Sequence, residues 1–389
     1  MPTYKITISG QVQGVGFRPL VYGLAKCFSL TGTVSNNEEG VVIFVSGPKD
    51  SIQQFFEKLI KNPPPVSKIK NSEILEIENM EFANFNIVPS VKSGQINLPL
   101  TPDFAICDDC KNDIQNPENR RYNYPFTTCV NCGPRWAITQ TFPFERNHTT
   151  INDFPMCNVC EKEYLNPADR RFHSQTNTCH TCGISLILLD NLGNIIASTS
   201  ENIFKKIAKL LSEGNIVAIK NTGGYLLCCN AENDEVIKKL RRKKNRQKKP
   251  FAVLFPSMEF LQNDLKINKL QRKSLDSAER PINIIPLGNY KGKIALNAVA
   301  PGLNQLGVML PYSGILQLLA NELNFPIIAT SGNIHSSPII GNNEEALEKL
   351  KQVADYFVQH NLEILHPQDD SVVKFSAKFN QKVLFRRAR

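Results

Sequence analysis

Eight of the eleven cysteines stand in four CxxC pairs, a residue type and spacing that could bind metal ions. Eighteen residues separate the first pair from the second, 24 the second from the third, and 18 the third from the fourth. Two CxxC pairs about 15 to 20 residues apart are typical of a zinc site whose four thiolates leave no position for a reacting water. We therefore predict two structural zinc ions, with pairing within or across the two halves left open. The predicted ligands are Cys107, Cys110, Cys129, Cys132, Cys157, Cys160, Cys179 and Cys182.

These pairs belong to an internal repeat with a period of 50 residues. "DFAICDDC" at residue 103 returns as "DFPMCNVC" at residue 153, and NP, RR and CG dipeptides recur in register. The pattern indicates duplication of one small unit. Segments this short and this poor in apolar residues need metal to fold, and zinc binding supplies on the order of 10 kcal/mol.

A finger that binds nucleic acid is the alternative for this repeat. Its basic residues include Arg120, Arg121, Arg170 and Arg171. Acidic residues are interspersed among them and no ladder of aromatic and basic residues appears, so we predict no nucleic-acid partner. The histidines of the segment, His148, His173 and His180, are interpreted as surface residues or as neighbours of the ligands, because eight cysteines are available.

The stretch "GQVQGVGFRPL", from Gly10 to Leu20, has the residue types of an anion-binding loop. Its glycines let the backbone approach a ligand closely, and the helix predicted after them presents free N–H groups at its positive end. Arg18 can add a bidentate grip on phosphate or carboxylate. Taken alone, such a pattern is weak evidence, and a tight strand-to-helix turn with a solvated arginine is the alternative.

A second basic feature precedes an apolar strand. Seven of the ten residues from Leu240 to Lys249 are basic, and "PFAVLF" follows them. Such runs are usually solvated helix faces or targeting signals. A basic cluster directly before a buried strand can instead project into a cleft and hold a triphosphate. The net charge of +9 also favours anionic partners.

The predicted elements divide the chain into three domains. Residues 1–91 read as strand, helix, strand, strand, helix, strand, which predicts an antiparallel sheet with both helices on one face, of the α+β class. Residues 90–102 are interpreted as a linker, and residues 100–185 as a small zinc-binding domain. Residues 195–389 alternate amphipathic helices with apolar strands, which predicts an α/β domain around a substantial buried sheet.

The chain has no apolar run of membrane-spanning length, and "MPTYKITISG" lacks the core of a secretory signal. We therefore predict a cytoplasmic protein with no membrane partner. The three cysteines outside the CxxC pairs, Cys27, Cys228 and Cys229, are predicted to be small buried residues.

The first segment resembles acylphosphatases along its whole length. The resemblance rests on "GQVQGVGFR" followed by "GTVSN" and "EGVV". It implies a ferredoxin-like fold in which Arg18 and Asn36 are catalytic, the first pairing with the phosphate and the second orienting the attacking water. It also implies a phosphate-binding loop formed by Gln13, Gly14, Val15, Gly16 and Phe17. Because an acyl phosphate is already activated, positioning and charge stabilisation suffice, without a nucleophilic side chain or a metal.

The third segment resembles the YrdC family, which makes carbamoyl-adenylates from ATP. The resemblance rests on "KNRQKKPF", "TSGN" and "AIKNTGGYLL", with Gln247 standing where stand-alone members usually have proline. It implies that Lys244, Arg246 and Lys249 hold the ATP phosphates and that Ser331 and Asn333 line the nucleotide pocket. It further implies that the carbamoyl site is bordered by Lys220, Gly223, Gly224 and Tyr225.

The three domains in this order resemble the HypF family of hydrogenase-maturation carbamoyltransferases. Stretches such as "RRYNYPFTTCVNCGPR", "LGVMLPY", "DDSVV" and "FRRAR" carry the resemblance over the whole chain. It implies hydrolysis of carbamoyl phosphate to carbamate and phosphate, and then formation of carbamoyl-adenylate from carbamate and Mg-ATP with release of pyrophosphate. The carbamoyl group would finally pass to the C-terminal cysteine of a HypE-type acceptor, as a precursor of the cyanide ligands of NiFe hydrogenase.

One departure and two rival functions accompany this resemblance. The sequence ends at "LFRRAR", where the family continues into a TsaD-type transferase domain, so we expect the final transfer to need that domain. A threonylcarbamoyl-adenylate synthase would use only the third segment, with threonine and bicarbonate as substrates. An RNA-binding module would show strong, steeply salt-dependent binding without ATP turnover.

Overall fold

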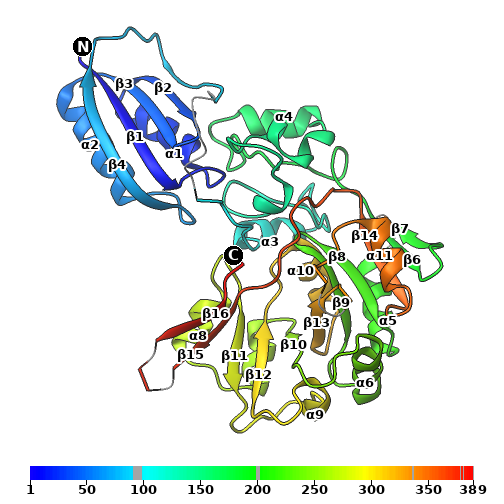
Figure 1. Cartoon of the computed structure of the whole chain (residues 1–389). Coiled ribbons are helices and arrows are strands. Elements are labelled where there is room, and N and C mark those ends of the chain that lie inside the picture. Colours follow the sequence, from blue (N-terminus) through cyan, green and yellow to red (C-terminus); the bar gives the residue numbers. More distant parts are fainter. Residues whose placement is uncertain (91–98, 199–201, 335–336, 377, 380, 389) are drawn as a thin grey trace. The chain divides into compact units, whose positions relative to one another are not determined.

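The computed structural model describes residues 1–90, 99–198, 202–334, 337–376, 378–379 and 381–388 (Figure 1). Its contacts define two compact units. Unit 1 combines Met1–Pro102 with Thr128–Cys182, and unit 2 combines Asp103–Thr127 with Gly183–Arg389. The predicted linker falls largely on residues 91–98, which lie outside the described residues. The segment 100–185 is shared between the two units, and the three predicted domain boundaries stay a prediction.

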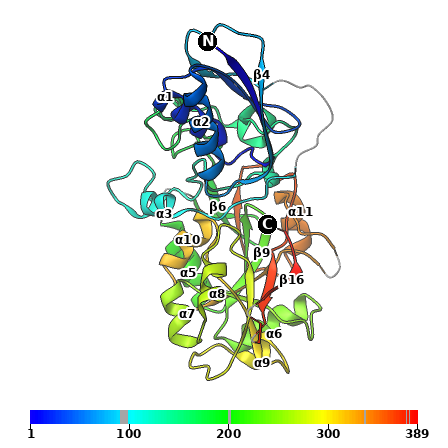
Figure 2. The ribbon, with the colours of Figure 1, turned by 90° about the vertical axis from the view of Figure 1, so that its left-hand side faces the viewer.

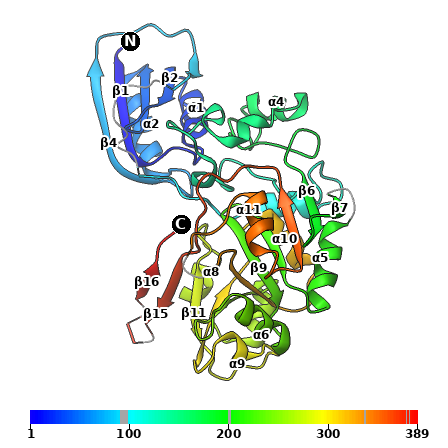
Figure 3. The same cartoon turned by 45° about the vertical axis from the view of Figure 1, so that its right-hand side comes forward.

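The first part of unit 1 is a five-stranded sheet with two helices. Its elements are β1 (Thr3–Gln11), α1 (Phe17–Cys27), β2 (Thr31–Asn36), β3 (Val41–Ser46), α2 (Lys49–Lys61), β4 (Lys68–Ile77) and β5 (Phe85–Ile87). The strand order is β4-β1-β3-β2-β5, and every neighbouring pair is antiparallel except β2 with β5. Figures 1 and 3 show the long strands β1 and β4 side by side. The predicted antiparallel sheet is confirmed, with a short parallel strand added at one edge.

Simple periodicities explain why this sequence forms these elements. Alternate residues of β1 are buried, and α2 buries Ile52, Phe55 and Leu59 at the three- to four-residue spacing of an amphipathic helix. The helices α1 and α2 pack against each other. Cys27 at the end of α1 is exposed, so its predicted burial is wrong, whereas Cys228 and Cys229 are buried as predicted.

The rest of unit 1, residues 128–182, contains little regular structure, and we call it the cysteine segment. It holds three short 3-10 helices, η1 (Trp136–Ile138), η2 (Arg146–His148) and η3 (Thr150–Asp153), and one α-helix, α4 (Asn158–Leu165). Its buried residues include many polar ones, among them Arg135, Arg171 and Asn177. This composition fits the prediction that the segment depends on metal rather than on an apolar core.

Unit 2 is built on a mixed sheet of eleven strands in the order β16-β15-β11-β12-β10-β13-β9-β8-β14-β6-β7. The strands are β6 (Leu186–Asp190), β7 (Ile195–Ser198), β8 (Val217–Asn221), β9 (Gly224–Asn230), β10 (Ala252–Leu254), β11 (Ile282–Pro286), β12 (Gln305–Met309), β13 (Ile327–Ser331), β14 (Tyr356–His360), β15 (Val372–Phe375) and β16 (Lys382–Arg386). The central strands β8 and β9 are buried along nearly their whole length, as their apolar runs predicted.

Eight helices of unit 2 accompany this sheet in the described part of the chain. They are α3 (Asp108–Gln115), α5 (Ile203–Ser212), α6 (Asp234–Lys243), α7 (Met258–Asp264), α8 (Lys269–Leu275), α9 (Leu296–Val299), α10 (Gly314–Asn321) and α11 (Asn343–Leu350), of which α3 precedes the cysteine segment. Figure 2 shows α5, α7 and α10 along one side of the strands. Among the described residues, no helix has the length and apolar character needed to cross a membrane.

Candidate functional site

The glycine-rich loop joins β1 to α1 and turns its backbone into a small cavity of about 30 Å3 in unit 1. Gly14 and Gly16 have φ angles of +69° and +80°, a region that side chains with a Cβ rarely adopt. Gly16 caps α1, so the N–H groups of the first helical turn lie at this loop, and a helix leaves these groups without partners of its own. The loop is therefore suited to bind an anion at the helix N-terminus.

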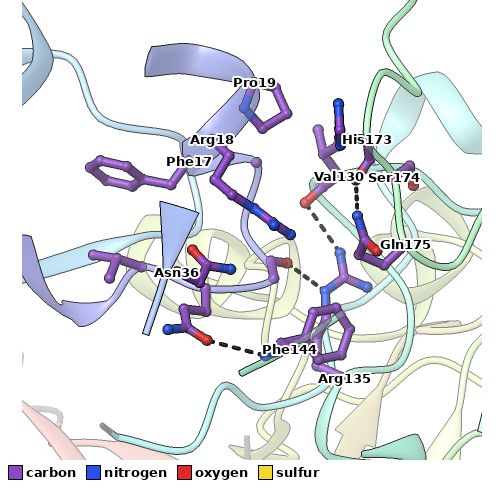
Figure 4. Close-up of a pocket in the computed structure, with 14 residues that line it drawn as sticks. Phe17, Arg18, Pro19, Asn36, Val130, Arg135, Phe144, His173, Ser174 and Gln175 are labelled. Atoms are coloured by element: carbon purple, nitrogen blue, oxygen red, sulfur yellow. Dashed lines mark hydrogen bonds between the residues drawn. The ribbon is translucent and has the colours of Figure 1, made fainter. Parts of the chain in front are cut away.

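The structure brings most of the residues predicted for this site together around the cavity. Six of them line it: Gln13, Gly14, Gly16, Phe17, Arg18 and Asn36. Val15 is not among them, because its side chain is buried inside unit 1. Figure 4 shows Arg18 reaching into the same space that Asn36 of β2 borders. Asn36 Oδ1 is buried and has no hydrogen-bond partner within the described residues, as expected of a group that meets a water or ligand.

The cysteine segment forms the opposite wall of this cavity, which the sequence patterns did not reveal. Its lining residues are Val130, Arg135, Phe144, His173, Ser174 and Gln175 (Figure 4). The backbone N–H of Phe144 donates to Gln13 Oε1 at 3.1 Å, while Gln13 Nε2 donates to the carbonyl oxygens of Asn37 and Gly40. A Cβ on Gly14 would lie 3.0 Å from both Arg135 Cδ and Phe144 Cδ1. The loop is thus covered, and only a small ligand fits.

Arg135 fastens the loop to the backbone around two of the cysteines. Its Nε donates to the carbonyl oxygen of Gly14 at 2.5 Å. Its two terminal nitrogens donate to the carbonyl oxygens of Cys129, Val130, Cys132 and Pro134, at 2.9 to 3.2 Å. These five acceptors match the five N–H donors of a guanidinium. Arg135 therefore joins the glycine-rich loop to the CxxC turn. It occurs in the first half of the repeat only, where "CGPR" has "CGIS" as its counterpart.

Arg18 itself has an acidic partner. Its Nη1 donates to Glu145 Oε1 at 2.6 Å, and the two side chains are only 10% and 17% exposed. Glu145 lies in the cysteine segment, directly before η2. No sequence motif pointed to it, because the contact joins residues 127 positions apart.

Four thiols of unit 1 lie close enough together to hold a metal ion. The sulfur atoms of Cys157, Cys160, Cys179 and Cys182 all lie within 4.8 Å of one another. Three of the pairs measure 3.6 to 3.8 Å. A tetrahedral zinc site with Zn–S bonds of about 2.3 Å requires sulfur–sulfur distances of about 3.8 Å, whereas a disulfide requires about 2.05 Å. The cluster therefore fits zinc, and its four positions are all thiolate.

The other quartet has the same local geometry in each of its pairs. Cys107 and Cys157 both stand immediately before a helix, α3 or α4, with nearly equal backbone angles. The N–H of Cys132 donates to the carbonyl of Cys129 at 3.4 Å, as that of Cys182 does to Cys179 at 3.3 Å. The predicted duplication of one metal-binding unit agrees with these matched turns.

The histidines of the cysteine segment differ in their surroundings. His180 is exposed as expected, and His148 Nδ1 lies 2.6 Å from the carbonyl oxygen of Pro143. His173 is half-buried and lines the cavity of unit 1, a place that the sequence patterns did not predict. Burial, with the nearby Arg18 guanidinium, lowers the pKa of His173 to about 4, and the Glu145 carboxylate opposes part of this change.

The low pKa of His173 predicts a dependence of stability on pH. Between pH 6.5 and 4 the unfolded chain binds a proton that the folded one does not, so the free energy of unfolding falls as the pH falls through this window. When the pH is lowered from 7.5 to 5.5, the free energy of unfolding should fall for the unmodified chain. For His173→Gln this fall should be smaller by up to about 1 kcal/mol, a figure that allows for the partial exposure of the ring. Urea denaturation at both pH values measures this difference. His180→Gln, in the same segment, should follow the unmodified chain; equal pH dependence in all three proteins would contradict the assignment.

Unit 2 contains a larger cavity of about 450 Å3, a volume within the range of small-molecule sites. It lies along strands β10 to β13, β15 and β16. Three of the predicted nucleotide-site residues, Arg246, Lys249 and Ser331, line it. Thr330, Asp369 and Arg386 also line it and were not predicted individually, although "DDSVV" and "FRRAR" contain the last two.

The basic run before β10 is held in place by its own members. Arg241 is buried, and its Nη1 donates to the carbonyl oxygens of Arg246, Gln247 and Lys249. Arg241 and Arg246 both lie over the ring of Phe251, at 4.4 and 4.6 Å. The alternative of a fully solvated helix face is therefore wrong for Arg241, which shapes the loop that follows α6.

Two predicted residues join this loop to the turn after β13. Lys244 Nζ donates to the carbonyl oxygen of Ser331 at 2.6 Å and to Asn333 Oδ1 at 2.9 Å. Arg246 Nη1 donates to Thr330 Oγ1 at 2.8 Å. Burial, with the positive charges of Arg246 and Lys249, lowers the pKa of Lys244 to about 7. Mutual repulsion of these cations is what a bound polyanion would relieve.

The remaining predicted residues do not line this cavity. Tyr225 is buried, and its hydroxyl donates to Asn343 Oδ1 at 3.0 Å. Lys220 Nζ donates to the carbonyl oxygen of His360 at 3.1 Å. Gly223 and Gly224 pack against the backbone of Gln368 and Ile340, where a Cβ would approach within about 3 Å. The structure thus places these four residues in the tightly packed surroundings of β8 and β9.

Three family models match the chain. An acylphosphatase model matches residues 4–87, a HypF finger model matches residues 106–139 and 156–189, and a model described as telomere recombination, for Sua5, YciO and YrdC proteins, matches residues 209–388. Each of the two finger matches contains one cysteine quartet. Together with the sheets described above, they give a ferredoxin-like acylphosphatase domain, a zinc-finger region and a YrdC-like domain.

Curated relatives cover the chain from end to end. The carbamoyltransferase HypF of Synechocystis sp. is 41% identical over 389 residues, which are 100% of this chain and 50% of the relative. The probable carbamoyltransferase HypF of Methanocaldococcus jannaschii is 42% identical over 387 residues, 99% of this chain and 50% of the relative. A crystal structure of full-length HypF in the phosphate- and nucleotide-bound form matches with a TM-score of 0.94 and 42% identity, over 100% of this chain and 50% of that one. The chain therefore spans about half the length of these relatives.

Proposed function

This chain belongs to the HypF carbamoyltransferase family, and from that premise we propose that unit 1 hydrolyses carbamoyl phosphate while unit 2 adenylates the carbamate released. The observation that carries the proposal is the cavity in unit 1, which we call the phosphate cavity, where loop glycines, Arg18 and Asn36 meet in a space that admits only a small ligand. Carbamoyl phosphate is among the smallest acyl phosphates, and its phosphate is a natural ligand for a helix N-terminus.

In the first reaction, the cavity positions water and phosphate. The oxygen of water bonds to phosphorus, the bond from phosphorus to the carbamoyl oxygen breaks, and carbamate and inorganic phosphate result. Arg18 and the N–H groups of the loop stabilise the charge that develops on the phosphoryl oxygens, and Asn36 orients the water. Buried and without a partner of its own among the described residues, Asn36 Oδ1 is suited to that role.

In the second reaction, a carbamate oxygen attacks the α-phosphorus of Mg-ATP, and pyrophosphate leaves. The cations around the cavity of unit 2 support this step. Arg246 and Lys249 line the cavity, and Lys244 is held at the Ser331–Asn333 turn. Their charges would hold the triphosphate, with Ser331 and Asn333 beside the nucleotide. Lys220, Gly223, Gly224 and Tyr225 are proposed to shape the carbamoyl end from the neighbouring strands β8 and β9.

The later fate of the carbamoyl group is also a proposal. We propose that the whole protein passes it to the C-terminal cysteine of a HypE-type acceptor, as a precursor of the cyanide ligands of NiFe hydrogenase. Zinc in the two cysteine quartets would serve folding alone, because thiolate fills all four positions. ATP as substrate and eight reduced thiolates suit the cytoplasm, which we propose as the location.

Exchange of labelled pyrophosphate into ATP tests the two reactions together. We expect exchange that depends on carbamoyl phosphate, because adenylation is reversible and hydrolysis supplies the carbamate. Threonine with bicarbonate serves as the comparison, since a threonylcarbamoyl-adenylate synthase would use that pair instead. Exchange with threonine and bicarbonate alone would overturn the proposal in favour of that activity.

An RNA-binding function is disfavoured by two of the four arginines of the repeat, whereas Arg120 is exposed and Arg170 half-buried. Arg121 in unit 2 and Arg171 in unit 1 are 1% and 5% exposed, so their guanidinium groups do not face a nucleic-acid backbone. Salt-dependent RNA retention by this chain, in the absence of any pyrophosphate exchange, would reverse that conclusion.

A further inference from the structure

The arginine of the phosphate cavity is held by a carboxylate from outside the acylphosphatase-like region. Residues 4–87 match the acylphosphatase model, whereas Glu145 belongs to the cysteine segment. Glu145 Oε1 accepts hydrogen bonds from Arg18 Nη1 at 2.6 Å and from Ser90 Oγ at 2.5 Å. Within the described part of the chain, Glu145 is the one hydrogen-bond partner of the Arg18 side chain.

This contact uses one nitrogen of a five-donor group. A guanidinium presents two N–H groups on each terminal nitrogen and one on Nε, in a fixed planar fork. With Nη1 bound to Glu145, Nη2 and Nε are available to a second anion in the cavity that Arg18 lines. Glu145 therefore fixes the orientation of the fork while leaving room for phosphate.

The position of Glu145 is itself well supported. The next residue, Arg146, donates from its backbone N–H to Gln175 Oε1 at 2.9 Å. Its Nη1 donates to the carbonyl oxygens of Gln175 and Asn177, at 2.8 and 3.1 Å. Gln175 lines the same cavity. These hydrogen bonds fix the backbone beside Glu145, so its side chain is held in the site rather than being a mobile surface group.

We propose that Glu145 is a positioning residue of the phosphate cavity, which orients Arg18 and at the same time weakens the binding of inorganic phosphate. This inference rests on the proposed hydrolysis of carbamoyl phosphate. The carboxylate and a phosphate bound by the other side of the same fork are like charges a few ångströms apart, in a pocket where solvent screens them poorly. Inorganic phosphate is a product of the proposed reaction, and a site holding it too tightly would be blocked after each turnover. The carboxylate thus favours its release.

Phosphate binding by three variants tests the proposal. Glu145→Gln keeps the shape and an oxygen that accepts from Arg18, but removes the charge. We expect it to bind inorganic phosphate about tenfold more tightly than the unmodified chain, by isothermal titration calorimetry and as a lower inhibition constant in carbamoyl phosphate hydrolysis. Glu145→Ala also removes the support of Arg18, and its kcat should fall at least tenfold. Glu57→Gln is the control, because Glu57 pairs with Lys61 on the exposed face of α2.

The outcomes separate the inference from the proposed function. Damage to the fold cannot make phosphate bind more tightly, so tighter binding by Glu145→Gln supports the role of the charge directly. Equal or weaker binding by Glu145→Gln, with Glu57→Gln unchanged, overturns the inference even if the chain hydrolyses carbamoyl phosphate. If the unmodified chain binds phosphate but hydrolyses no carbamoyl phosphate, the proposed function fails while the phosphate titrations still decide the role of Glu145. An unmodified chain that binds no phosphate overturns both.

Discussion

Arg18→Ala is expected to lower the rate of carbamoyl phosphate hydrolysis by about a thousandfold. The guanidinium stands at the start of α1, is 10% exposed, and is the charged donor that we propose meets the phosphoryl oxygens in the cavity of unit 1. Loss of the guanidinium would also leave the largely buried Glu145 carboxylate without its positively charged partner. Release of inorganic phosphate from carbamoyl phosphate measures the effect, and Arg18→Lys should recover only a small part of the rate, because an ammonium cannot reproduce the fork.

The same variant links the two proposed reactions. Arg18→Ala should abolish pyrophosphate exchange with carbamoyl phosphate, yet exchange should return when ammonium carbamate is supplied directly, because the nucleotide site of unit 2 is untouched. Lys26→Ala is the matched control, since Lys26 is an exposed cation in the last turn of the same helix. Exchange that survives Arg18→Ala with carbamoyl phosphate as the sole carbamoyl source would refute the sequence of reactions.

Cys160→Ser should remove one zinc ion per chain and unfold the part of the cysteine segment that holds the second quartet. Cys160 is fully buried, and its sulfur lies 3.6 Å from that of Cys182. Zinc binding to such a site contributes on the order of 10 kcal/mol, and few apolar side chains surround it to replace that contribution. Because His173, Ser174 and Gln175 lie between the ligands of this quartet and line the phosphate cavity, hydrolysis should fall with the zinc.

Three measurements on this variant distinguish the effect of losing zinc from the effect of losing a thiol. Zinc content should fall by one equivalent, limited proteolysis should cut within residues 157–182, and the inhibition constant of phosphate should rise. Cys27→Ser, at an exposed cysteine outside the quartets, should leave all three unchanged. A Cys160→Ser protein with full zinc content and protease resistance would show that the quartet is not the structural metal site.

Much of the fold and of the chemistry was predictable because it depends on local patterns. The loop glycines, the period-two strands of residues 3–46 and the helical periodicity of α2 are properties of neighbouring residues, and the structure has all of them. The CxxC pairs are predictable for the same reason, because a turn of four residues is enough to bring two sulfur atoms to the separation that one metal ion requires. The sulfur atoms of Cys129 and Cys132 lie 3.8 Å apart.

The parts that were not predictable depend on contacts between distant segments. His173 has no sequence feature that marks it as a cavity residue, because the phosphate loop it faces lies about 160 positions earlier. Tyr225 shows the reverse case, in which a motif residue is packed into the core and only its hydroxyl finds a polar partner. Cys27 is exposed because it lies off the face of α1 that buries Val21 and Ala25, which composition alone does not determine.

The amino-acid sequence by itself determined which backbone could cradle an anion, which thiols could hold zinc and which basic loop could meet a nucleotide. These are matters of residue type and short spacing. Only the tertiary structure decided that the cysteine segment covers the glycine-rich loop and that Arg135 joins the two by hydrogen bonds. It also decided that Glu145 pairs with the guanidinium of Arg18. The reason is physical. Hydrogen bonds and ion pairs form wherever folding brings donors and acceptors together, and no sequence periodicity indicates a contact between side chains more than 100 residues apart.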